Sequence, residues 1–343
     1  MQYKFDILNL EPGDILLSRG DGLQAKIISN MTKGSFSHAM LYVGGTVIHA
    51  DGAGVYSKNP QRIYSKKKDG LAVYRLKEKP TKELIEEICK KARSEVGKLY
   101  DLKGAISSIS NGTDKSAEHK QFCSKLVALA FQAGGIIFEK SIDKMTPNDF
   151  CQSNLLELKD HVIPMSEYDQ IFAQSPDYNL ELQIETFEWL SKARDIAFKK
   201  RKRIIGSISN VFEYLIDYPE DDDTFCKLID ESRYYEFANI DKEINPDRYD
   251  LLLFKEHLSS IDNDKKKKFL LNEQIGLGDE IRSKRDNYLW SILLLAEKDI
   301  KFFRKNHDLA KNLYINATTR AHVLNLINEY YKFVSKIDSN ISS

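Results

Sequence analysis

The sequence predicts an α+β fold followed by an all-helical segment, and three observations lead to this prediction. Short apolar segments bounded by glycine and turn residues alternate with helical patterns over the first half of the chain. Strand signals fade after about residue 166, and the later patterns have helical spacing. The length of 343 residues corresponds to two domains. We therefore expect domains at 1–165 and 166–343, with Ser175-Pro176-Asp177 as a candidate linker.

A small antiparallel sheet is expected in the first domain. The predicted strands are Asp14–Ser18, His38–Val43, Thr46–Ala50 and Leu71–Leu76. The second and third are joined by Gly44-Gly45, a connection typical of a type I′ hairpin because both central residues need positive φ. Sequential strands joined this way pair in antiparallel fashion.

Helices are expected beside this sheet and throughout the second domain. In the first domain they are Gly22–Met31, a helix capped by Thr81, Gln121–Ala133 ended by Gly134-Gly135, and a short helix starting at Thr146-Pro147. In the second domain they are roughly 181–217, 224–236, 247–259, 264–275, 279–305 and 308–337.

Composition and charge exclude several classes of protein. Lys+Arg and Asp+Glu both number 51, so the zero net charge argues against a nucleic-acid-binding surface. The N-terminus has no secretory signal pattern, and the longest apolar run, Leu289–Ala296, falls far short of the roughly 20 residues that span a bilayer. We expect a cytoplasmic protein, with export by a signal-independent route left open.

The four cysteines do not form a metal or disulfide pattern. They lie at positions 89, 123, 151 and 226 without any CxxC spacing, which favours reduced, independent thiols. Cys123 stands at the predicted start of a helix, where unpaired N–H groups and the helix dipole stabilise a thiolate. Its own N–H is then placed to contribute to an oxyanion hole. Cys89, Cys151 and Cys226 are expected to be core residues.

Two histidines accompany this cysteine on the predicted hairpin. In the register set by the glycine turn, Val43 pairs with Thr46 and His49 lies opposite Met40. His38 and His49 are then near diagonal neighbours, at a separation that long side chains bridge. An imidazole oriented by a second imidazole is a workable general base, because the second ring selects the tautomer of the first.

Six segments of the chain together resemble a known family. In order, they are PGDILLSR, FSHAMLYVGG, VIHADGAGV, VGKLYDLKG, FCSKLVALAF and MTPNDF. They are similar to the circularly permuted branch of the NlpC-type papain-like cysteine hydrolases, and most similar to its bacterial YiiX/YebB-like group. The lecithin:retinol acyltransferase-like enzymes share the permutation. The resemblance covers about residues 9–155.

The resemblance implies a permuted papain-like fold and a role for several residues. Cys123 matches the nucleophile, His38 the general base and His49 the position that orients the base. Many YiiX-like sequences have glutamate at that third position, whereas the acyltransferase-like branch has histidine, so the branch stays open. Tyr100 resembles a tyrosine near the nucleophile that donates to the oxyanion or lines the cleft. Asp14 matches a family position with a structural role.

The expected function is that of a cysteine hydrolase or acyltransferase that forms a thioester on Cys123. Such chemistry needs no metal and no organic cofactor. We expect a small-molecule, lipid-like or peptide substrate with an amide, ester or thioester carbonyl. Two alternatives are a peptidase acting on peptidoglycan-type or isopeptide bonds, and a catalytically weak domain that binds a partner through its helical tail.

One basic run in the tail bears on such a partner. Lys199–Arg203 follows an apolar stretch, and a basic amphipathic helix can lie on an anionic membrane. The alternative is a solvated turn whose apolar side belongs to the core. Peripheral membrane or protein contact through residues 166–343 is therefore an expectation.

Overall fold

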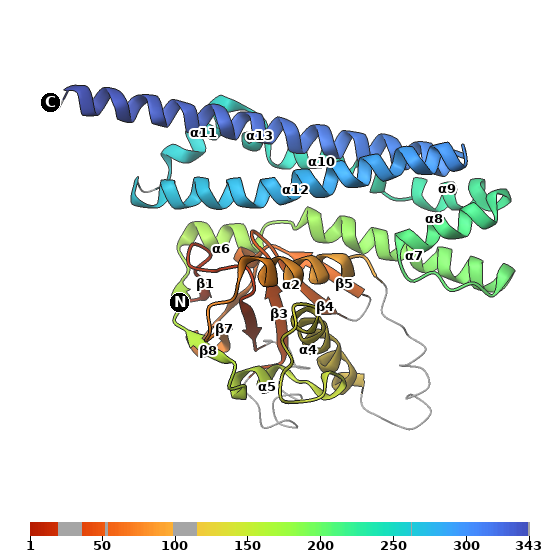
Figure 1. Cartoon of the computed structure of the whole chain (residues 1–343), viewed down its shortest axis with the longest axis horizontal. Helices are drawn as coiled ribbons and strands as arrows, with labels where there is room; N and C mark the ends of the chain where they lie inside the picture. Colours follow the sequence, from red (N-terminus) through yellow and green to blue (C-terminus); the bar gives the residue numbers. More distant parts are fainter. Residues whose placement is uncertain (20–35, 52–53, 99–114, 262, 342–343) are drawn as a thin grey trace. The chain divides into compact units, whose positions relative to one another are not determined.

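The computed structural model describes residues 1–19, 36–51, 54–98, 115–261 and 263–341 (Figure 1). The chain divides into two compact units: Met1–Phe187 with Gly206–Ile208, and Glu188–Ile205 with Ser209–Ser343. The first combines antiparallel sheets with helices and the second is helical, which confirms the predicted fold class. The domain boundary at 165/166 stays a prediction; the first compact unit continues to Phe187.

The bounds of the elements are as follows. The strands are β1 Tyr3–Phe5, β2 Ile15–Ser18, β3 His38–Tyr42, β4 Val47–Asp51, β5 Gly54–Lys58, β6 Tyr64–Ser65, β7 Leu71–Leu76, β8 Leu156–Lys159 and β9 Val162–Pro164. The helices of the first unit are α2 Lys82–Glu95, α4 Lys115–Ala133, α5 Pro147–Gln152 and α6 Glu167–Gln174. Those that follow are α7 Tyr178–Arg201, α8 Ile208–Asp217, α9 Asp222–Asp230, α10 Phe237–Ile244, α11 Leu251–Ser259, α12 Asn263–Glu297 and α13 Lys301–Ile341.

A six-stranded antiparallel sheet with the order β5-β4-β3-β2-β7-β8 forms the centre of the first unit. The β3–β4 hairpin pairs Leu41 with Ile48, which confirms the register predicted from the glycine turn. Gly44 and Gly45 have φ of +90° and +74°, so both adopt the left-handed conformation that a type I′ turn requires. A second sheet, β6-β1-β9, completes the unit.

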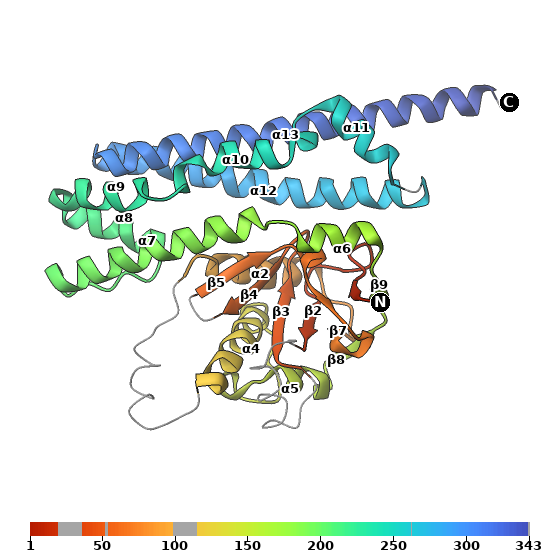
Figure 2. The same cartoon turned by 180° about the vertical axis from the view of Figure 1, so that it is seen from behind.

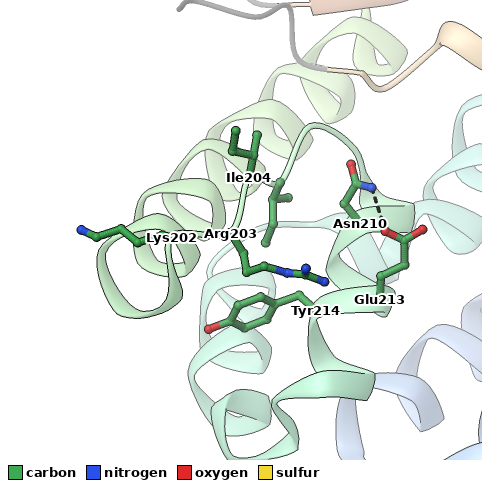
Figure 3. Close-up of a pocket in the computed structure, with 7 residues that line it drawn as sticks. Lys202, Arg203, Ile204, Asn210, Glu213 and Tyr214 are labelled. Atoms are coloured by element: carbon green, nitrogen blue, oxygen red, sulfur yellow. Dashed lines mark hydrogen bonds between the residues drawn. The ribbon is translucent and has the colours of Figure 1, made fainter.

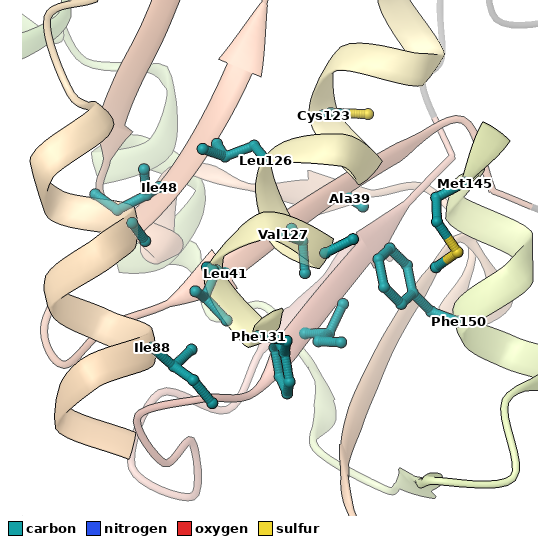
Figure 4. Packing of buried hydrophobic residues seen from close by; sticks show 14 of the residues in the cluster. Ala39, Leu41, Ile48, Ile88, Cys123, Leu126, Val127, Phe131, Met145 and Phe150 are labelled. Atoms are coloured by element: carbon teal, nitrogen blue, oxygen red, sulfur yellow. The ribbon is translucent and has the colours of Figure 1, made fainter. Parts of the chain in front are cut away.

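Both faces of the central sheet are covered, because alternate residues of each strand point to opposite sides. On one side Ala39, Leu41 and other strand residues pack against α2 and α4, where Ile88 and Phe131 are fully buried (Figure 4). The other side contributes Met40 and its neighbours to a separate cluster. That cluster includes residues of β1 and β9, so the smaller sheet lies over the second face.

The helices of the first unit agree with the sequence prediction except that α6 was not predicted and α4 starts earlier than expected. Thr81 caps α2 by accepting a hydrogen bond from the N–H of Leu84, and Pro147 begins α5 as expected. Helix α4, however, begins at Lys115 and not near Gln121, so the predicted start was wrong. The predicted helix Gly22–Met31 falls mainly on positions 20–35, outside the described residues.

The second unit departs from the predicted helix boundaries at several points. The helix expected at 224–236 ends at Asp230, α10 was not predicted, and the break expected between 305 and 308 lies at 298–300. The expected helix 181–217 is interrupted after Arg201, where Lys202 has a positive φ of +57°. The two helices expected around Gly276 and Gly278 form the single helix α12 instead. Glycine inside a helix costs only about 1 kcal/mol, which packing against α13 offsets, and these two long helices run side by side in both views (Figure 2).

Most of the basic run at the end of α7 is paired with carboxylates of the same unit. Nζ of Lys200 lies 2.5 Å from Oδ1 of Asp221, and Nη2 of Arg203 lies 2.8 Å from Oδ2 of Asp217. Arg201 makes a third ion pair, with Glu220. Beside them is a cavity of about 390 Å³ (Figure 3). Its lining residues are Lys202, Arg203, Ile204, Ile205, Asn210, Glu213 and Tyr214. Across the described residues, every helix is too short or too polar to cross a bilayer.

Candidate active site

The structure brings three of the predicted site residues together in the first unit. Cys123 lies on α4, His38 is the first residue of β3, and His49 is in β4. Nε2 of His38 is 3.1 Å from Nδ1 of His49, and the rings meet edge to face with centroids 5.0 Å apart. The Cys123 thiol shares a hydrogen bond with the side chain of His38. His38 therefore stands between the thiol and the second imidazole.

Burial determines which nitrogens of the pair carry protons. His49 is only 8% exposed, and its burial, with the nearby charges of His38 and Lys58, holds its pKa well below the usual value. It is therefore neutral near pH 7 and accepts a hydrogen bond at Nδ1 from Nε2–H of His38. Because Nε2 of His38 is engaged in this way, we assign Nδ1 of His38 to the bond with Cys123. A neutral His38 in this tautomer has its lone pair directed at the thiol.

The thiol itself is fully buried, and its surroundings still favour ionisation. Burial alone raises the pKa of Cys123. The charge of His38, the hydrogen bond with that ring and hydrogen bonds with the Ala39 backbone and the Ser124 hydroxyl act in the opposite direction. Together they outweigh burial, and the pKa of the Cys123 thiol is lowered. The arrangement can thus produce a thiolate–imidazolium pair.

The source of this activation differs from the one predicted. Because α4 begins at Lys115, Cys123 lies two turns inside the helix and not at its dipole-bearing end. The N–H of a residue at this depth is within the helical hydrogen-bond ladder, so its predicted contribution to an oxyanion hole loses its basis. His38 takes over the activating role that was expected from the helix terminus.

Two tyrosines also bear on the predicted site. Tyr100 lies outside the described residues, so its role as an oxyanion donor or cleft residue stays a prediction. Sequence reasoning missed Tyr56 on β5, whose ring stacks on that of His49 with centroids 5.8 Å apart. The signal was available, because Tyr56 lies opposite His49 on the next strand of the sheet, but β5 itself was not predicted.

The lowered pKa of His49 predicts that acid destabilises the first unit. In the unfolded chain this imidazole titrates near pH 6.5, whereas in the folded protein it stays neutral to lower pH. Its contribution to stability is therefore complete above pH 6.5 and is lost as the pH falls toward the folded pKa, at up to about 1.4 kcal/mol per pH unit.

Urea unfolding between pH 5 and 8 checks this expectation. Cys89, buried in the first unit, reports unfolding through its labelling by a thiol reagent. We expect the acid loss of stability to be smaller in His49→Gln than in the wild type. Equal pH slopes in the two proteins would contradict the assignment of a buried neutral imidazole.

The geometry of the site defines a class of protein. A cysteine on a helix packed over an antiparallel sheet, with its imidazole partner on a strand, is the arrangement of a papain-like thiol hydrolase. Here the histidine strand precedes the cysteine helix in the chain, so the order is permuted. Residues 9–174 match the model of the permuted papain-like amidase enzymes, the YaeF/YiiX or C92 family. That segment therefore belongs to this family, and the resemblance inferred from the six segments is confirmed.

Membership indicates a hydrolase of the cysteine type. None of the curated proteins compared with the chain is similar enough to count as a relative.

Proposed function

We propose that this protein is a cysteine amidase or acyltransferase in which Cys123 is the nucleophile, His38 the general base and His49 the group that orients the base. The observation that carries the proposal is the 3.1 Å contact between the two imidazoles, with His38 also hydrogen-bonded to the thiol. Family membership supports hydrolysis of an amide.

The chemistry follows from the proton positions derived above. Nδ1 of His38 takes the thiol proton, and the thiolate of Cys123 attacks the carbonyl carbon. The tetrahedral intermediate collapses as His38 returns the proton to the leaving amine or alcohol, and a thioester remains on Cys123. His38 then removes a proton from water or from another acceptor, which attacks the thioester and regenerates the thiol. His49 stabilises the imidazolium at each stage by accepting from its Nε2–H.

The substrate class proposed is an acylated, lipid-like amide or ester. Its support is the histidine at position 49, as in the acyltransferase-like branch, and the apolar pattern of Leu23, Ile27 and Ile28 in the sequence. A peptide substrate of the peptidoglycan or isopeptide type is the alternative. The two differ in the group attached to the scissile carbonyl, so a panel of donors separates them.

The test is acylation of the protein by a matched panel of donors. Acyl amides and esters of increasing chain length are compared with short peptide amides, and the thioester is detected by intact mass and by its cleavage with hydroxylamine. We expect acylation at Cys123 and faster reaction with the longer acyl chains. His38→Ala should slow it by about 10²–10⁴-fold, the usual contribution of a general base, and His49→Ala by a smaller factor.

Two results would count against parts of the proposal. Faster reaction with the peptide amides would replace the lipid-like substrate with the peptide alternative. Equal acylation of the wild type and His38→Ala would contradict the assignment of His38 as the general base.

A further inference from the structure

Behind the imidazole pair lies a column of aromatic rings that the proposed mechanism does not use. Tyr56 of β5 stacks on His49 at an interplanar angle of 26°, and Phe187 of α7 meets Tyr56 edge to face with centroids 4.6 Å apart. The three side chains are 8%, 8% and 5% exposed. Contacts therefore run without a break from the general base to a residue of α7.

This column packs against the ring of His49, whose orientation is fixed by a single hydrogen bond to the described residues. Nδ1 of His49 bonds to His38, but its buried Nε2 has no hydrogen-bond partner among the described residues. Rotation of the His49 side chain would remove Nδ1 from the base, and no second hydrogen bond to the described residues opposes it. Packing by Tyr56 then restrains the orientation of the ring.

Phe187 is itself held tightly against the edge of the sheet. A Cβ atom on Gly54 would lie 2.6 Å from Cε1 of Phe187, so the ring rests directly on the backbone of β5. One helical turn earlier, Gln183 accepts a hydrogen bond from the N–H of Ser57 at 2.8 Å and donates to its carbonyl at 2.9 Å. Its amide thus satisfies both backbone groups of a residue on an edge strand.

These contacts come from a part of the chain beyond the family match. The match ends at residue 174, whereas Gln183 and Phe187 lie on α7, within the first compact unit. We infer that Phe187 is a positioning residue for the active site: through Tyr56 it holds the imidazole of His49 in the orientation that His38 requires. The inference rests on the proposed function, because it assigns a role relative to that catalytic pair.

A positioning role for Phe187 predicts a change in the reactivity of the Cys123 thiol, and not only a change in the stability of the first unit. When the His49 ring loses its support, the imidazolium of His38 is less stabilised and the thiolate of Cys123 becomes less favourable. The other titratable groups that act on the His38–His49 pair include Cys123 on α4 and Lys58 on β5. Neither is altered by a substitution at Phe187, so a shift reports on the column.

The experiment measures the rate of Cys123 alkylation by iodoacetamide from pH 5 to 9 in the full chain. Phe187→Ala is compared with Phe5→Ala, which deletes a fully buried ring from the separate cluster on the other face of the central sheet. Phe187→Leu retains bulk and serves if Phe187→Ala does not fold. We expect the apparent thiol pKa to rise in the Phe187 variants, with at least a tenfold lower rate at pH 6. Phe5→Ala should keep the wild-type profile.

The possible outcomes separate this inference from the proposed function. A wild-type profile in both Phe187 variants, beside a lowered thiol pKa in the wild type, would overturn the inference alone. An ordinary thiol in the wild type would overturn the proposed function first. Parallel shifts in the Phe187 variants and Phe5→Ala would show a general loss of stability, and would also reject a positioning role.

Discussion

Cys123→Ala is expected to lower acyl transfer by a factor of ~10⁴ or more, because it removes the atom to which the acyl group becomes attached. The side chain is fully buried, and the substitution deletes one sulfur atom from the core beside Ala39 and Leu126. A loss of this size in a folded protein therefore has a chemical cause. The measurement is thioester formation and product release with the best donor of the panel described above.

Cys89→Ala is the matched control for this prediction. Cys89 is also buried in the same cluster of the first unit, and it lies on α2, whereas Cys123, His38 and His49 lie on α4, β3 and β4. It should lose a similar packing contribution and keep its acyl-transfer rate within a few-fold. Comparable losses in both variants would point to damage of the core and against a nucleophile at position 123.

Asp14→Ala is expected to destabilise the first unit by about 3 kcal/mol, because it removes several hydrogen bonds of a fully buried carboxylate, and a bond to a charged group contributes ~1.5–3 kcal/mol. The Asp14 carboxylate is 0% exposed and accepts hydrogen bonds from Arg75 at 2.6 and 2.8 Å. It also accepts from the N–H of Glu11 at 2.8 Å. Asp14 directly precedes β2, which pairs with the strand that begins at His38, so the pair secures the sheet beneath the site.

The measurement follows thiol exposure during urea unfolding. Labelling of Cys89 reports on the first unit and labelling of Cys226 on the second, so each unit is followed separately. We expect the Cys89 transition of Asp14→Ala to move to lower urea. The double variant with Arg75→Met should lower the free energy of unfolding by less than the sum of the single changes, since Asp14 and Arg75 contact each other and share one interaction. An unchanged Cys89 transition would contradict a structural role for this pair.

Local signals predicted the part of the site that lies within one hairpin. A Gly-Gly turn determines the pairing of the strands on either side, so the proximity of His38 and His49 follows from their distances to that turn. Turn and cap residues act over a few positions, and so the caps at Thr81 and Thr146 were also predictable.

The start of α4 was misplaced because the polar stretch before Cys123 lacks an apolar stripe, although Ala117 and Glu118 are good helix formers.

Features that depend on distant parts of the chain could not be predicted from such local signals. The contact between Tyr56 and Phe187 joins residues far apart in sequence, and a single sequence contains no local signal for it. Its consequence for His49 appears only when the sheet and α7 are seen together.

The most direct test of the central claim, that His38 activates Cys123, is the pH dependence of iodoacetamide labelling at Cys123 in the wild type and in His38→Ala. Rates from pH 5 to 9 are measured by intact mass, with Cys89 as the internal reference. We predict a wild-type thiol that titrates below the ordinary value of about 8.5 and a higher apparent pKa in His38→Ala. A wild-type Cys123 that titrates like a free thiol, or with the same profile in His38→Ala, would contradict the account.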